Sequence, residues 1–96
     1  MDMKYIRLKW NHDNADEPIW LFSELDDQGH EVRKIECFKN GFCDFASPDA
    51  SSGCTRLSTQ RLPRLEEFAK DPEFEPHEIT REEFEEVWVK RRYKTG

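Results

Sequence analysis

The sequence lacks a long hydrophobic run, an internal repeat and a low-complexity tract. Its first ten residues, MDMKYIRLKW, carry charges at Asp2, Lys4, Arg7 and Lys9, a pattern that fits neither a signal peptide nor a membrane-spanning helix. We therefore expect a cytoplasmic protein that makes no contact with a membrane.

Cysteine and histidine are also scarce. The three cysteines, Cys37, Cys43 and Cys54, are an odd number, unlike the even set that cross-links a small secreted domain. An intracellular chain keeps its thiols reduced, so we expect no disulfide. The three histidines are scattered and no Cys-x-x-Cys spacing occurs, so neither a metal site nor another cofactor is expected.

Large side chains are well represented. At 96 residues the chain is long enough for a single domain, residues 1–96, and no more. Charged residues make up 38% of it, but three Trp and seven Phe supply side chains that build a core from few positions. A disordered chain would lack these aromatic residues.

Hydrophobic alternation predicts a sheet in the first half of the chain. Residues 4–10 alternate strictly and place Ile6, Leu8 and Trp10 on the buried face of a strand. Residues 19–25 are apolar on both faces, which is typical of a central strand. Two further strands, at 30–38 and 42–46, complete four consecutive strands that most simply form an antiparallel meander.

The last two predicted strands form a hairpin with two alternative registers. A two-residue Asn-Gly turn would leave Cys37 and Cys43 on opposite faces of the sheet. A three-residue loop with Gly41 in the left-handed region instead places the cysteines opposite each other on the hydrophobic face. This second register also places one pair of like charges across the strands. The free energy gained by burying the apolar groups outweighs the repulsion within that pair. We therefore predict the three-residue loop, with both cysteines buried and reduced.

The second half of the chain is predicted to contain a long loop and two helices. Residues 47–62 are rich in Ser, Gly and Pro and indicate a long surface loop, with a possible fifth strand near 54–58. A short helix is expected at about 64–70, ending before Pro72. Residues 74–79 are expected to be extended.

The C-terminal helix, residues 81–92, has the clearest local signal. Thr80 is placed as the N-cap and Glu83 closes a capping box. Its inner stripe is expected to contain Phe84, Val87, Trp88 and Arg91. The predicted fold class is α+β, with a four- to five-stranded antiparallel meander and both helices packed on one face.

Charge is distributed unevenly along the chain. Residues 66–86 hold ten acids against Lys70 and Arg81, a local net charge of −8, within a total of −6. Such a segment disfavours direct contact with nucleic acid and attracts a basic protein, although acids early in a helix also complement its dipole. The residues expected to meet a partner are Glu75, Glu78, Glu82, Glu85, Glu86 and Val89, with Val89 as an apolar anchor.

The sequence WNHD at residues 10–13 offers an alternative site. His12 is near Asp13, Asp16 and Glu17, a combination suited to acid–base chemistry or to a cation. A solvated loop in which His12 packs on the strand end is the simpler interpretation. No nucleophile, phosphate-loop or calcium-loop motif is present, so we predict that the protein is not an enzyme.

Several motifs resemble those of a small bacterial domain family of unknown function. They are MKYIRLKW-x-HD, SELDDxxxEVRKIExFxxG and DPEFEPHEITREEFEEVW, and together they cover residues 3–89. The resemblance implies a single-domain cytoplasmic protein, encoded in some cases among toxin and immunity genes. It also implies aliphatic residues where this chain has Cys37 and Cys43, and it supplies no catalytic residue.

Together these features predict a non-enzymatic binding protein. We expect an immunity-type or inhibitor protein that neutralises a basic partner, such as a nuclease toxin, through its acidic surface. A phage-encoded inhibitor of a host nucleic-acid-handling defence complex is one alternative, and a small enzyme centred on His12 is another. The protein is expected to be a monomer or a weak dimer.

Overall fold

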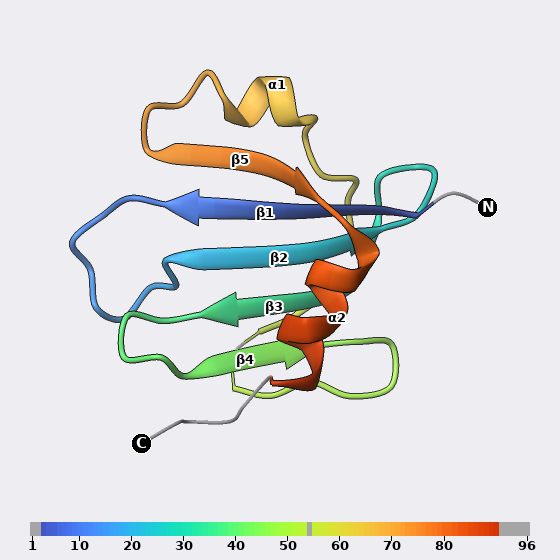
Figure 1. Cartoon of the computed structure of the whole chain (residues 1–96), viewed down its shortest axis with the longest axis horizontal. Helices are drawn as coiled ribbons and strands as arrows, with labels where there is room; N and C mark the ends of the chain where they lie inside the picture. The colour runs from blue at the N-terminus through green and yellow to red at the C-terminus, as the bar shows by residue number, and fades with distance from the viewer. Residues whose placement is uncertain (1–2, 54, 91–96) are drawn as a thin grey trace.

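The structure is a computed structural model that describes residues 3–53 and 55–90 (Figure 1). It contains one five-stranded antiparallel sheet and two short helices, which confirms the α+β class. None of the helices in these residues is long and apolar enough to cross a membrane. The elements in chain order are β1 (Lys4–Trp10), β2 (Trp20–Leu25), β3 (Glu31–Cys37), β4 (Cys43–Ala46), α1 (Leu65–Phe68), β5 (Phe74–Ile79) and α2 (Arg81–Val89).

The first four strands form the predicted meander, and the spatial order is β4-β3-β2-β1-β5. The fifth strand is not near residues 54–58 but is β5, which pairs antiparallel with the free edge of β1. Pro76 has no N–H to donate, which suits a strand at the edge of a sheet. Between β4 and β5 the chain therefore passes from one edge of the sheet to the other (Figure 1).

Both faces of β1 carry buried side chains, although only one face of this strand was expected to be buried. Ile6 and Leu8 are buried on the predicted face. Tyr5 points to the opposite face and is only 6% exposed, because α2 lies there and its Phe84 ring is 5.4 Å from the Tyr5 ring. Burial of Phe84 and Ile35 is complete, and these two side chains form the core with Tyr5.

The two helices are shorter than predicted and lie apart. α1 ends at Phe68, after which Lys70 and Asp71 donate to carbonyls three residues back, a tighter turn than the α-helix. It lies beside β5 at the edge of the sheet, with the Phe68 and Phe74 rings 5.7 Å apart (Figure 1). The predicted end of α2 at residue 92, and the place of Arg91 on its inner stripe, fall outside the described residues.

The described residues between 47 and 62 form the predicted long loop, and most of them are exposed, but parts of the loop pack against the sheet. They lie along β3 and β4 and complete the hydrogen bonds of polar side chains there. The Thr55 hydroxyl, 2% exposed, donates to Glu36 Oε1 at 2.7 Å. The backbone N–H of Ser58 donates to Glu31 Oε1 at 2.7 Å. These contacts hold parts of the loop against the face opposite α2.

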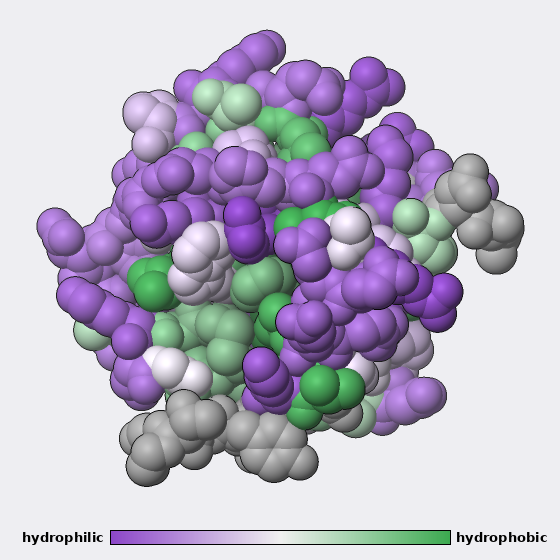
Figure 2. Space-filling model, in the orientation of Figure 1, coloured by the Kyte–Doolittle hydropathy of each residue, from purple (hydrophilic) through white to green (hydrophobic). Residues whose placement is uncertain are grey.

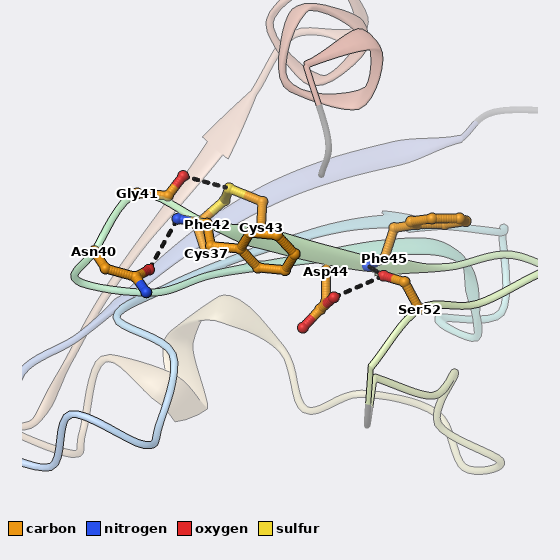
Figure 3. Close-up of a disulfide and its surroundings, with 8 residues drawn as sticks. All are labelled: Cys37, Asn40, Gly41, Phe42, Cys43, Asp44, Phe45 and Ser52. Carbon is orange, nitrogen blue, oxygen red and sulfur yellow. Dashed lines mark hydrogen bonds between the residues drawn. A yellow bond between two sulfur atoms is a disulfide. The ribbon is translucent and has the colours of Figure 1, made fainter. Parts of the chain in front are cut away.

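The β3–β4 hairpin has the predicted register, with Cys37 opposite Cys43 and Gly41 at a φ of 88° (Figure 3). The Asn40 side chain accepts a hydrogen bond from the Phe42 N–H at 2.9 Å and closes the loop. The two sulfur atoms form a disulfide, so the expectation of reduced, fully buried thiols is wrong. The register itself is the reason, because it holds the two side chains against each other at the margin of the core. Cys54 lies outside the described residues.

The capping box of α2 is confirmed. Thr80 Oγ1 accepts a hydrogen bond from the Glu83 N–H at 3.1 Å, and Glu83 Oε1 accepts one from the Thr80 N–H at 2.9 Å. The chain therefore enters α2 with two of its otherwise unpaired backbone N–H groups satisfied.

Replacing Thr80 with Ala is expected to lower the free energy of unfolding by about 1 kcal/mol, because it removes the N-cap acceptor. Urea denaturation measures the change. Thr59→Ala is the matched control, since Thr59 is exposed and its replacement should change stability by less than about 0.5 kcal/mol. Equal midpoints for the two variants would contradict a stabilising cap.

Candidate protein-binding site

A charge network joins α2 to the sheet. The Arg33 guanidinium on β3 pairs with Glu24 on β2 and, at 2.6 Å, with Glu85 on α2. The same guanidinium lies 4.9 Å from the centre of the Phe84 ring and 4.8 Å from the centre of the Trp88 ring. Arg33 therefore holds α2 through an ion pair and two cation–π contacts.

The carboxylate of Glu24 is the buried end of this network. It is 6% exposed and accepts a hydrogen bond from the Tyr5 hydroxyl at 2.8 Å. Burial alone would raise the pKa of Glu24, but the hydrogen bonds from Arg33 and Tyr5 outweigh it and hold this pKa below its usual value. The hydrogen bond to Glu24 also raises the pKa of Arg33. The network thus keeps its charges at neutral pH.

Glu85 is committed to this network and is not a free outer carboxylate. The hydrogen bond from Arg33 lowers the pKa of Glu85, and its side chain is 37% exposed. On a helical wheel Glu85 lies 100° from Phe84, at the border between the inner and outer sides. Its long side chain can therefore turn back to the sheet once β3 presents a cation there.

The other outer residues of α2 are exposed as expected. Glu82 and Glu86 are exposed, and Val89 is 61% exposed. With Arg81 and Glu85 they line a shallow depression of about 420 Å³. Figure 2 shows a small hydrophobic area at the C-terminal end of α2 among hydrophilic side chains. We call Glu82, Glu86 and Val89 the acidic face.

The two predicted acids of β5 do not join the acidic face. Strand residues alternate between faces, so Glu75 points to the α2 side of the sheet and Glu78 to the opposite side. Glu75 accepts a hydrogen bond from the Asn11 side chain at 2.7 Å. The structure therefore groups only three of the six predicted contact residues on the outer side of α2.

His12 lies at the end of β1 with both ring nitrogens engaged. Nε2 is 2.8 Å from the Pro18 carbonyl oxygen, and Nδ1 accepts a hydrogen bond from the Asn14 N–H at 3.0 Å. The ring packs edge-on against Trp10 at 4.4 Å. Within the described residues, no group of three His, Cys, Asp or Glu side chains is placed to hold a metal ion.

A known domain family matches residues 4–93, which is 90 of the 96 residues and includes every strand and both helices. The chain belongs to the DUF6881 family of domains of unknown function. The predicted resemblance to a family of unknown function is thereby confirmed. No curated protein and no solved structure matches the chain.

The Arg33 network of this DUF6881 domain was missed at the sequence level, although one signal was present. Glu24 lies inside the mostly apolar strand WLFSEL and is its one charged residue. A carboxylate at such a position needs a cation or several hydrogen bonds, because burial of an unpaired charge is costly. That cation is on the neighbouring strand β3, where Arg33 lies directly opposite Glu24.

Proposed function

We propose that this DUF6881 domain is a non-enzymatic binding protein that neutralises a basic protein partner through its acidic face. One observation carries the proposal: Val89, a large apolar residue that is 61% exposed, lies in a depression lined by Glu82 and Glu86. An apolar anchor surrounded by carboxylates suits a cationic protein surface, because the anchor supplies burial and the carboxylates speed encounter.

The chemistry of the acidic face favours a nucleic-acid-handling partner. A carboxylate-rich helix that covers a cationic surface competes there with phosphate groups. A nuclease toxin neutralised in the cytoplasm by an immunity-type protein fits this description. The same face would suit a phage-encoded inhibitor of a host defence complex, and the genes that flank this one distinguish the two.

The loop around His12 supports a non-enzymatic role. A general base needs a ring nitrogen that can reach the proton it removes. In His12 one nitrogen contacts the Pro18 carbonyl and the other accepts from Asn14. Proton transfer by His12 would require this loop to open.

Replacing Glu82 and Glu86 with Lys is expected to leave the fold intact, because both are exposed and neither side chain forms a hydrogen bond or an ion pair in the described residues. Association with the basic partner should slow by about tenfold at low salt, since the steering charges are reversed. Added salt should shrink the difference. The partner is identified by mass spectrometry after capture on the wild type, then purified, and its association rate is measured by stopped flow.

Glu66→Lys/Glu67→Lys is the matched control for this experiment. It makes the same change in net charge on exposed residues of α1. If the control slows association as much as the acidic-face variant does, net charge rather than the acidic face attracts the partner, and the proposed site is wrong.

A further inference from the structure

α2 covers only part of its face of the sheet. It crosses the strands near one end (Figure 1), with Phe84 beside Tyr5 on β1 and Trp88 beside Phe45 on β4. The seven-residue strand β1 is about 23 Å long, and a helix with its side chains is about 10 Å wide. The face therefore has room for a second helix beside α2.

The uncovered part of this face combines cations with aromatic rings. The Arg7 guanidinium and the Lys9 ammonium lie 5.3 and 5.7 Å from the centre of the Trp20 ring. The Trp20 ring stacks beside Phe22 at 6.3 Å. Figure 2 shows a hydrophobic area here, next to α2 and bordered by hydrophilic side chains. We call Arg7, Lys9, Trp20 and Phe22 the cationic shelf.

The two cations of the shelf have carboxylates nearby but form no ion pair with them in the part of the chain that the structure describes. Arg7 Nε is buried there without a hydrogen-bond acceptor. Glu75 lies opposite Lys9 but accepts a hydrogen bond from Asn11, and Glu83 near Arg7 closes the capping box. A buried N–H without an acceptor is costly, so the shelf suits an incoming carboxylate.

The acidic face has the same layout as the shelf. α2 advances from β1 toward β4, so Glu82 lies at the β1 end and Val89 further along. The shelf likewise has its cations on β1 and its aromatic rings on β2. The seven positions from Glu82 to Val89 advance the helix by about 10.5 Å. Since neighbouring strands are about 4.8 Å apart, a helix with Glu82 over β1 carries Val89 past the rings on β2 to the level of β3, where Cys37 of the disulfide lies.

We propose that a second copy of this chain docks on the cationic shelf, face to face, about a twofold axis parallel to α2. Each α2 then lies beside the other between the two sheets. Glu82 and Glu86 of one copy meet Arg7 and Lys9 of the other, while Val89 reaches the aromatic rings and the neighbouring disulfide. Because the contact is reciprocal, it closes as a dimer and does not propagate.

The dimer uses the surface that we assign to the basic partner, so the two complexes exclude each other. The inference does not depend on the proposed function, since the shelf takes no part in binding the basic partner. Reversing the shelf charges should weaken the dimer and leave capture of that partner intact. Reversing the charges of the acidic face should weaken the dimer and also slow capture of the partner.

Analytical ultracentrifugation of the full chain tests the proposal, over concentrations from about 10 μM to about 1 mM. The wild type is expected to dimerise reversibly, and less so in high salt. Arg7→Glu/Lys9→Glu and Glu82→Lys/Glu86→Lys should each weaken dimerisation by at least about tenfold. An equimolar mixture of the two variants should restore it, because every shelf then faces a helix of opposite charge.

Lys39→Glu/Lys70→Glu is the control, a charge reversal at exposed lysines outside both surfaces. Circular dichroism checks each fold, and Lys9→Glu alone replaces the shelf variant if that variant fails to fold. A wild type that stays monomeric, or a dimer that survives the charge reversals, overturns the proposal. Binding of polyglutamate or an oligonucleotide to the shelf of a monomer would overturn it as well, by assigning the shelf to another anion.

Discussion

Replacing Arg33 with Met is expected to lower the free energy of unfolding by about 3–5 kcal/mol. A 96-residue domain has a total stability of about 5–15 kcal/mol, so this change approaches the limit of folding. The substitution leaves the buried carboxylate of Glu24 without its cation and frees Glu85 on α2. It also removes the cation between the rings of Phe84 and Trp88.

Urea denaturation of Arg33→Met measures this loss, and two further variants locate its origin. Adding Glu24→Gln to Arg33→Met should recover part of the stability, because the uncompensated charge disappears. Arg33→Lys keeps the charge but loses the paired hydrogen bonds and the flat contact with the rings, so its stability should be intermediate. If Arg33→Met is as stable as the wild type, the network does not hold α2.

Acidification is expected to cause the next largest loss of stability. The folded-state pKa values of Glu24 and Glu85 lie below their ordinary value of 4.5, so the folded protein binds fewer protons than the unfolded chain near that pH. The stability from both carboxylates is therefore fully present above about pH 4.5 and is lost as pH falls through the folded pKa values. Denaturation midpoints between about pH 7 and pH 3 measure the loss.

Arg33→Met provides the control for this pH dependence. Without the cation, burial still raises the pKa of Glu24, and the hydrogen bond from Tyr5 is the main effect left to oppose it. The part of the acid-induced loss that Glu24 causes should therefore shrink. A variant that loses stability in acid as steeply as the wild type would show that other carboxylates govern the acid transition.

Local sequence signals predicted the elements whose partners are close in sequence. Alternation identified β1, the need for a left-handed Gly41 set the hairpin register, and the pair of Thr80 and Glu83 marked the start of α2. β5 was predicted only as extended, because its partner β1 lies about 70 residues away and Pro76 weakens the strand signal. The disulfide was missed because a reducing compartment was assumed, although the predicted register already places Cys37 opposite Cys43.

The candidate site was predicted only where local sequence determines it. Helical periodicity placed Glu82, Glu86 and Val89 on the outer side of α2, and the structure agrees. Periodicity within one helix cannot show that Glu85 is taken by Arg33, since that depends on the register of β2 and β3. The cationic shelf was also missed, because Arg7 and Lys9 were assigned to the unburied face of a half-buried strand, β1.

The pairing of β1 with β5 sets the order in which the domain can be completed during synthesis. β1 is the first strand to leave the ribosome, yet one of its two edges stays open until residues 74–79 emerge. Tyr5 also stays uncovered during this time, because α2, the helix that covers it, follows β5 in the chain. A nascent chain that stalls between β4 and β5 would carry a folded meander with an unpaired strand at its edge, the kind of surface on which chains aggregate.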